Sequence, residues 1–264
     1  MMRAMPVRIV ADGVVTRSVR DTAAFLREAE KIQRNLRLPP VGDITHAAKR
    51  RLRVAVVTTS PVNPTAAHVT EQTLKTAGLL EELGHQVTET TSPMGRDFAD
   101  DFLVFWSMLA LTMLRTGRMS FGPSWDRAKV DNLTVGLERH CARNLHRYPG
   151  AVRRLRRSAT VSERFFADYD VLLTPTLAHE TPRVGHLDPM NDFETTMGRL
   201  LEWVAFTPYQ NATGEPAISL PLGEGAEGLP LGMMLGAPAG HEATLLGLAY
   251  ELEAARPWRR IQDA

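Results

Sequence analysis

The sequence predicts an α/β fold in which a mixed, largely buried β-sheet is flanked by helices. Three short runs rich in β-branched residues predict its strands, at residues 53–57, 171–174 and 217–220. Each run is too apolar for a strand with one face in water, so we expect the sheet to be covered on both sides. Helical patterns separate the runs, and alternation of strands with helices is typical of layered α/β proteins.

The first run opens a strand–helix–strand unit. A buried strand is expected within residues 51–58, and a second, alternating strand at residues 86–90. Between them, Asn63 is placed to cap a helix with Pro64 at its first position, and Gly84 is placed to end it. If the two strands are parallel, this segment is a βαβ unit.

Helices and strands alternate through the rest of the chain. Ser18 is expected to cap the first helix, with Asp21 returning a bond as in a capping box. Residues 97–168 are expected to be rich in helix, with a loop at residues 117–126. Further helices are predicted at residues 18–31, 193–206 and 243–255, and further strands at residues 170–174, 217–222 and 231–236. No repeat, low-complexity tract or clear linker divides residues 1–264, so we treat them as one unit.

The composition is that of an ordinary globular protein. Of 264 residues, 44% are hydrophobic and 23% charged, and the formal net charge is +1, so we expect neither nucleic acid nor an anionic membrane as a partner. No apolar run approaches the roughly 20 residues that cross a bilayer, and the first residues lack the apolar core of a secretory signal. These patterns predict a cytoplasmic protein.

The motifs of common cofactor, metal and hydrolase sites are missing from the sequence. Gly223, Gly225 and Gly228 lead into a strand rather than a helix, so they do not form a phosphate loop. His140 and His146 are spaced wrongly for one helix face, and Cys141 is expected to be a small buried hydrophobe. We therefore expect no cofactor and no metal ion.

Three segments, in the right order, resemble the carboxyl-terminal half of amidase-signature enzymes. The first, GVVTRSVRDTAAFL at residues 13–26, is similar to the family stretch G-P-x-A-R-S-V-x-D-x-A-x-x-L. The second, residues 52–90, resembles the family's βαβ passage. The third and most specific, NATGEPAISLPLG at residues 211–223, matches N-x-x-G-x-P-A-x-S-x-P-x-G. The resemblance implies that residues 1–264 form the carboxyl-terminal part of an amidase-signature domain. By their residue types, Asn211 and Gly214 suit a turn, and Pro216 and Pro221 bracket a short strand.

The resemblance also implies which catalytic groups to look for. The family uses a serine nucleophile, a second serine in a cis peptide and a lysine, all placed before the first matching segment. Here residues 1–12 precede that segment and contain no serine and no lysine. The lysines further on lie in helix and connector patterns (Lys31, Lys49, Lys75 and Lys129). We therefore expect no catalytic residue in this chain, which would be truncated, or started at an internal methionine such as Met1, Met2 or Met5, and inactive alone.

The intact enzyme implied by the resemblance hydrolyses the C–N bond of a small-molecule carboxamide through an acyl-serine. Two alternatives stay open: the A subunit of a tRNA-dependent glutamine amidotransferase, and a non-catalytic subunit that completes a two-chain amidase. The amidotransferase subunit carries an acid about two turns before the motif's Asn. Trp203 or Val204 stands in that place, which favours an apolar or aromatic acyl group over glutamine.

The resemblance places five residues around the acyl site, and we expect them to line one cavity: Thr176, Trp203, Phe206, Thr207 and Asn211. An apolar wall with a few polar groups is the usual make-up of a ligand site. Alternatively, Trp203 and Phe206 belong to the core. If the chain lacks its partner half, an uncovered sheet edge and apolar face should make it self-associate.

Overall fold

The computed structural model of the protein describes residues 6–7, 9–11 and 13–259. Met1, Met2 and Met5, on which the expectation of an internal start rests, lie outside the described residues. The helices are α1 (Val19–Ile32), α2 (Ala67–Glu82), α3 (Phe98–Phe121), α4 (Asn132–Asn144), α5 (Tyr148–Asp168), α6 (Phe193–Trp203), α7 (Pro208–Thr213) and α8 (Glu242–Ala255), with 3-10 turns η2 (Arg127–Lys129) and η3 (Leu145–Arg147). The strands are β1 (Arg53–Val56), β2 (Gln86–Glu89), β3 (Val171–Pro175), β4 (Ala217–Glu224) and β5 (Pro230–Gly236).

The five strands form one mixed sheet in the order β2-β1-β3-β5-β4. β1 pairs in parallel with both β2 and β3, while β5 runs antiparallel to β3 and β4. The predicted α/β class is confirmed, and the three apolar runs lie in the same sheet. The parallel pairing of β1 with β2 also confirms the βαβ unit around α2.

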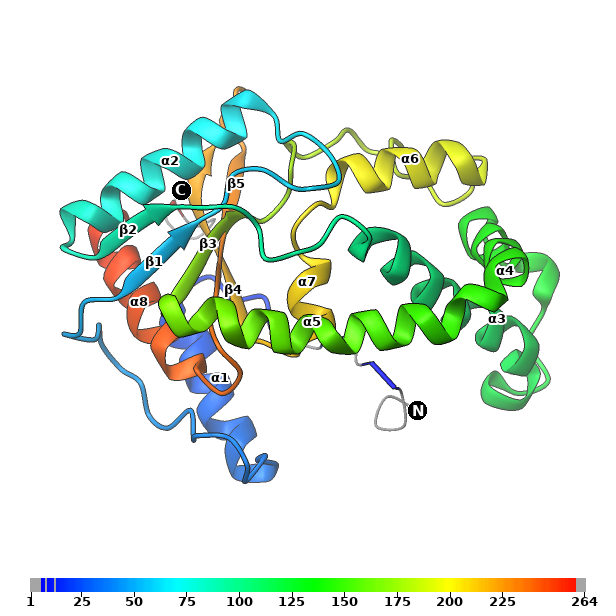
Figure 1. Ribbon diagram of the computed structural model, residues 1–264, viewed down its shortest axis with the longest axis horizontal. Helices are drawn as coiled ribbons and strands as arrows, with labels where there is room; N and C mark the ends of the chain where they lie inside the picture. Colours follow the sequence, from blue (N-terminus) through cyan, green and yellow to red (C-terminus); the bar gives the residue numbers. More distant parts are fainter. Residues whose placement is uncertain (1–5, 8, 12, 260–264) are drawn as a thin grey trace.

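The two faces of the sheet are covered differently (Figure 1). On one face, Val54, Leu173 and Met233 are fully buried in a large cluster with apolar residues of α1, α2 and α8. On the other, Ala55, Leu172 and Met234 pack in a smaller cluster against Phe166 of α5 and Phe206, which follows α6. We call the sheet with α1, α2 and α8 the sheet body.

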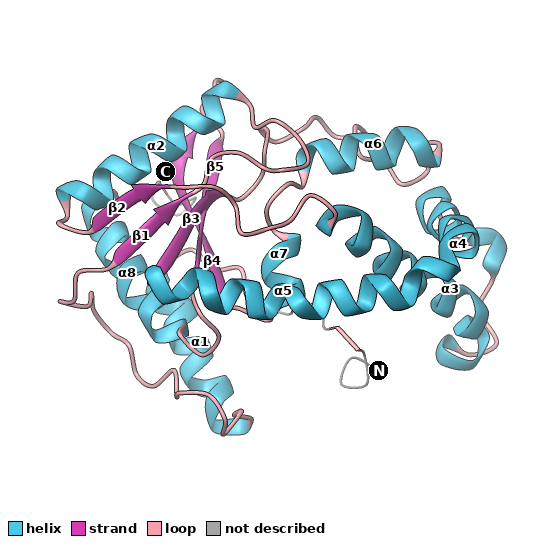
Figure 2. Cartoon of the chain, in the orientation of Figure 1, coloured by secondary structure: helices cyan, strands magenta, loops and turns pink. Residues whose placement is uncertain are grey.

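α3, α4 and α6 form a second region, the helical arm, and α5 runs from the sheet to this arm (Figures 1 and 2). An ion pair fastens α5 to α3. The guanidinium of Arg154 donates to both carboxylate oxygens of Asp101, at 2.7 and 2.6 Å. Asp101 is 3% exposed, so its charge is stabilised by this paired contact.

Helix α1 begins as predicted, because the Ser18 side chain accepts a hydrogen bond from the backbone N–H of Asp21. The start of α2 differs from the prediction. α2 begins at Ala67 rather than Pro64, and its N-cap residue Ala66 makes no side-chain cap bond. The amide of Asn63 instead donates to the backbone oxygen of Leu201 at 2.8 Å. Just before α2, the Ala66 N–H donates to the backbone oxygen of Ala178 at 2.9 Å.

The loop predicted at residues 117–126 starts too early. α3 continues to Phe121 and ends at Gly122, whose φ is 84°. Gly117 is a site of close approach rather than a helix breaker, because a Cβ there would lie 2.2 Å from the Trp125 ring.

Two predicted boundaries in the second half are also wrong. The helix expected over residues 193–206 ends at Trp203, and a separate helix, α7, begins at Pro208, which suits a first helical position. Asn211 therefore lies in α7, and the turn is made by Gly214 alone, at φ 78°. Pro221 lies inside β4 at an irregularity in its pairing with β5, which an edge strand tolerates.

Candidate functional site

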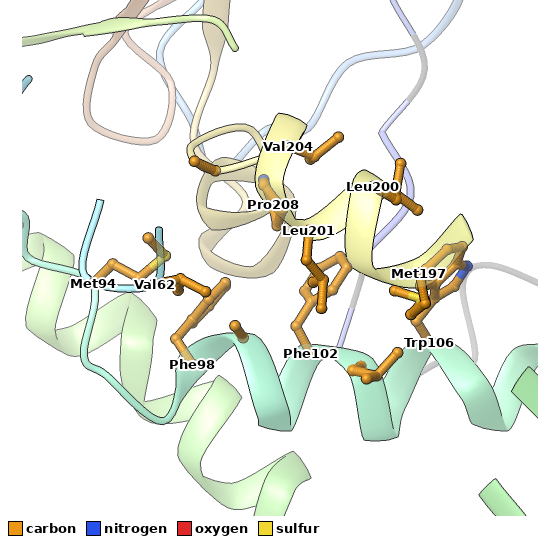
Figure 3. Close-up of a pocket in the computed structure, with 13 residues that line it drawn as sticks. Val62, Met94, Phe98, Phe102, Trp106, Met197, Leu200, Leu201, Val204 and Pro208 are labelled. Carbon is orange, nitrogen blue, oxygen red and sulfur yellow. The ribbon is translucent and has the colours of Figure 1, made fainter. Parts of the chain in front are cut away.

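An apolar groove runs between α3 and α6 (Figure 3). Phe98, Phe102 and Trp106 line it from α3, at four-residue steps that place them on one helix face. The opposite wall comes from α6 and the residue that follows it. Its residues have the spacing i, i+3, i+4, i+7, which also places them on one helix face: Met197, Leu200, Leu201 and Val204. The two apolar stripes face each other without closing, which leaves a space of about 540 Å³, solvent-open part included.

Every residue that lines this groove is apolar. A charged group placed there would lose its hydration without gaining a partner from the lining residues. The groove therefore suits a neutral, apolar part of a ligand.

The carboxyl-terminal end of α6 is held from the loop that follows β3. Ala178 N–H donates to the backbone oxygen of Trp203 at 3.0 Å, and the Trp203 indole N–H donates to the backbone oxygen of Glu180 at 3.3 Å. The Glu180 carboxylate in turn accepts a hydrogen bond from Ala226 N–H in the β4–β5 turn. One wall of the groove is thus tied to the sheet.

Next to α7, the sheet presents a surface of small and hydroxyl-bearing residues. The hydroxyls of Thr176 and Ser219 lie 2.7 Å apart, and Ala217 and Ser219 are exposed. Gly232 lies beneath this pair, where a Cβ would come within 2.7 Å of both hydroxyl oxygens. The absence of a side chain at Gly232 is what allows the two hydroxyls to meet.

Two buried polar atoms near this surface lack a hydrogen-bond partner among the residues that the structure describes. They are Oγ1 of Thr174 and Oε1 of Gln210, in side chains that are 3% and 6% exposed. Thr174 is in register with Met234, which also pairs with Ser219, so its side chain is on the same face as the hydroxyl pair. The Gln210 amide packs over Gly236 of β5. Unpaired buried polar atoms are rare in folded proteins, so each of these two needs a structural explanation.

Burial raises the pKa of several titratable groups outside the groove. Burial raises the pKa of Tyr209 on α7 to about 12, and it raises the pKa of the nearby Glu215 above its ordinary 4.5. Burial likewise raises the pKa of the Cys141 thiol, which disfavours the nucleophilic thiolate. Cys141 is 1% exposed, as the interpretation of a small buried hydrophobe predicts.

The five predicted site residues fall into different environments. Thr176 bonds to Ser219 on the open sheet surface, while Thr207 and Asn211 are half-buried at α7. Trp203 is half-buried at the end of α6. Phe206 is 4% exposed within the core cluster beside β3 and β5, as the alternative interpretation expects. The groove is lined instead by their sequence neighbours Val204, Ala205 and Pro208, so a cavity shared by the five stays a prediction.

The sequence reasoning missed the α3 wall of the groove. Its signal was present in the four-residue spacing of Phe98, Phe102 and Trp106, but the same spacing marks any core-facing helix. Among the described residues, no group of three or more His, Cys, Asp or Glu could hold a metal ion. None of the helices within the described residues is long and apolar enough to cross a bilayer.

Comparison with known proteins shows what kind of protein carries this site. The model of the family described as Amidase matches residues 2–246. The chain belongs to the amidase family. A Mycobacterium leprae protein described as an amidase, AmiC, is 58% identical over 262 residues, which are 99% of this chain and 56% of that protein. The 6-aminohexanoate-cyclic-dimer hydrolase of Paenarthrobacter ureafaciens is 30% identical over 94% of this chain and 54% of its own length.

Solved structures agree with this membership. The structure of 6-aminohexanoate cyclic dimer hydrolase complexed with substrate matches 94% of this chain and 55% of that chain, with a TM-score of 0.79 and 28% identity. The A subunit of the glutamyl-tRNA(Gln) amidotransferase of Thermotoga maritima matches 94% of this chain and 53% of that chain, with a TM-score of 0.66 at 20% identity, which shows a common fold. This member of the amidase family spans about half the length of the curated relatives it matches.

Proposed function

We propose that this chain is the carboxyl-terminal part of an amidase that hydrolyses the C–N bond of neutral carboxamides with an apolar or aromatic acyl group. The observation that carries the substrate class is the groove between α3 and α6, which is lined only by apolar side chains. Val204 is one of them, and Trp203 or Val204 stands where the A subunit of a glutamine amidotransferase is expected to carry an acid. Because an ammonium group would be buried there without a counter-charge, the groove favours an amidase over the amidotransferase subunit.

In this proposal the nucleophile, its proton relay and the oxyanion donors come from a polypeptide segment outside these 264 residues. Two observations support it. The chain covers 54–56% of relatives such as AmiC and the cyclic-dimer hydrolase. The surface around Ser219 and Gly232 is built of small residues that allow another backbone to approach closely, with the unpaired Thr174 and Gln210 beside it. The segment could be continuous with this chain or belong to a second chain.

The chemical step follows from the separate roles of the outside segment, which supplies the nucleophile, and the groove, which binds the acyl part. The outside serine would attack the carbonyl carbon of the amide and give its hydroxyl proton to the proton relay. The relay would then protonate the leaving amine as the C–N bond breaks, and water would hydrolyse the acyl-serine. The groove would bind the acyl part before the attack and hold the carbonyl carbon at a fixed place. The reaction consumes one water and yields a carboxylic acid and an amine.

The proposal is tested by joining this chain to the part of a relative that it does not match. Residues 1–264 are expressed alone and fused behind the amino-terminal part of Mycobacterium leprae AmiC, which is 58% identical in the matched region. We expect amine release from neutral aryl and aliphatic amides by the fusion only, because a positioned nucleophile supplies several orders of magnitude of rate. Replacing Val204 with Asp in the fusion should shift the preference toward amides that carry an ammonium group.

Two results would contradict the proposal. The first is turnover by the chain alone that a single serine change such as Ser219→Ala abolishes, since that would place the nucleophile within these residues. The second is a fusion that prefers charged over neutral acyl groups. Size-exclusion chromatography of the chain alone tests the related expectation that its uncovered surface causes self-association.

A further inference from the structure

The end of α6 has an unusual set of hydrogen-bond partners. The last four backbone oxygens of a helix have no partner within it, so each must be satisfied from outside or by water. In α6, the oxygen of Leu200 accepts from Val204 N–H at 2.8 Å, and that of Trp203 accepts from Ala178 N–H at 3.0 Å. The oxygen of Leu201 accepts from the side-chain amide of Asn63 at 2.8 Å. Of these three bonds, only the last depends on the identity of a side chain.

The Asn63 bond involves two segments that lie next to the apolar groove. Asn63 lies in the loop between β1 and α2, 138 residues away from Leu201 in the sequence. Its neighbour Val62 lines the groove, as does Leu201 itself. The bond therefore joins two segments that both contribute walls to the same space. It is a short contact from a half-buried residue, and its loss would leave the Leu201 oxygen unpaired.

We propose that Asn63 is a positioning residue for the groove: its amide holds the end of α6 so that Leu200, Leu201 and Val204 face α3 at the separation a ligand needs. The inference rests on the proposed function, because it assumes that the groove binds the acyl part of the substrate. Asn63 itself need not touch the ligand. The chemistry requires a neutral hydrogen-bond donor, since a carboxylate at this position would face the partial negative charge of the Leu201 oxygen.

The test measures binding rather than catalysis, so the chain can be studied as it is. Purified residues 1–264 are titrated with N-phenyl-1-naphthylamine, a neutral apolar fluorophore, and its fluorescence gives the dissociation constant. We expect Asn63→Ala and Asn63→Asp to weaken binding about tenfold, the size expected when one hydrogen bond that organises a site is lost.

Asn144 provides a matched control. Its side-chain amide also donates to a backbone oxygen near a helix end, that of His140 in α4, at 3.0 Å. Asn144→Ala removes a bond of the same kind away from the groove, and we expect its dissociation constant to stay close to that of the wild type. Thermal unfolding of all variants is recorded in parallel, to show that the compared chains are folded.

A pH series separates positioning from general loss of structure. In the Asn63→Asp variant, the introduced carboxyl can donate its O–H to the Leu201 oxygen when it is protonated, whereas the carboxylate cannot. We therefore expect this variant to recover binding as the pH falls toward the ordinary Asp pKa of about 3.9, relative to the wild type at the same pH. Asn63→Ala should show no such recovery.

The outcomes distinguish this inference from the function on which it rests. A wild-type chain that binds no fluorophore overturns the groove as a binding site, and the role of Asn63 falls with it. If the wild-type chain binds the fluorophore and the Asn63→Ala variant binds it equally well, the groove remains a binding site and only the role of Asn63 is overturned. Equal weakening by Asn144→Ala would also overturn it, because the effect would then not be specific to the end of α6.

Discussion

Apolar side chains of the same kinds are closed off from water in the sheet body, but they line an open groove in the helical arm. In the sheet body, Leu173 and Leu235 are fully buried between the sheet and its helices. In the arm, Leu200 and Leu201 are only half-buried and form the wall of an open groove. Apolar area that is closed off from water stabilises the fold, while apolar area left facing a groove remains available to a ligand. The difference predicts that one substitution will have opposite consequences in the two regions.

The largest effect is expected from Leu173→Ala in the sheet body. Removing a fully buried leucine side chain leaves a cavity, which costs about 2–5 kcal/mol of unfolding free energy. Chemical denaturation followed by circular dichroism measures this loss. The folded fraction of the variant should still bind the neutral fluorophore, because Leu173 is remote from the groove lining. A loss below about 1 kcal/mol would mean that the sheet core can collapse around the cavity.

Two partly buried acids beside the sheet should give opposite pH dependences of stability. Burial would raise the pKa of Asp170 at the start of β3, but hydrogen bonds from Arg53 and the charge of Arg50 outweigh it and lower the pKa. Its stabilising effect is present above the unfolded pKa and is lost as pH falls through the folded one. Asp170→Asn should therefore destabilise the protein by about 1 kcal/mol at pH 7, and the difference should shrink in acid.

The pKa of Glu215, beside α7, shifts in the opposite direction to that of Asp170, because burial raises it. Its contribution to stability is fully present below the unfolded pKa and is lost as pH rises through the folded pKa. Glu215→Gln should then unfold at a higher denaturant concentration than the wild type at pH 7 and at a similar one near pH 4. A variant that is less stable at pH 7 would show that the bond from Thr213 Oγ1 to the carboxylate, 2.9 Å long, outweighs burial.

A much smaller loss of stability than for Leu173→Ala is expected from Leu200→Ala, its counterpart in the arm. Leu200 is partly exposed and borders space that is already open, so the loss should be about 1 kcal/mol. Binding of the neutral fluorophore should nevertheless weaken severalfold, since one wall of the groove is removed. If Leu200→Ala leaves binding unchanged, the comparison between the two regions fails and the groove is a packing defect.

Much of the sheet body could be predicted from the sequence because its signals are local. β-branched runs predicted β1 and β3, the Ser18 cap predicted the start of α1, and Gly84, at φ 89°, ended α2 as expected. Each of these patterns acts within a few residues of the position it determines. The motif at residues 211–223 likewise indicated the family that the comparisons show.

The errors have a common physical cause, which is contact between segments far apart in the chain. Asn63 has the side chain of a helix N-cap, but its amide N–H donates to the Leu201 oxygen, and α2 begins only at Ala67. Gly117 has the intrinsic preference of a helix end, but Trp125 packs against it and the helix continues. Local propensities are worth about 1 kcal/mol each, so a single tertiary contact is enough to override them.

The sequence by itself determined the fold class, the strands and the family. Hydrophobic periodicity and the 211–223 motif are patterns of residues close together in the sequence, so they can be recognised without the structure. Only the tertiary structure decided where a ligand could bind. The stripes of Phe98 and Phe102 on α3 and of Leu200 and Leu201 on α6 have the spacing of ordinary core-facing helices. Whether two such stripes close on each other or leave a groove depends on how far apart the helices are held. That separation is set by contacts between distant segments, which no local pattern encodes.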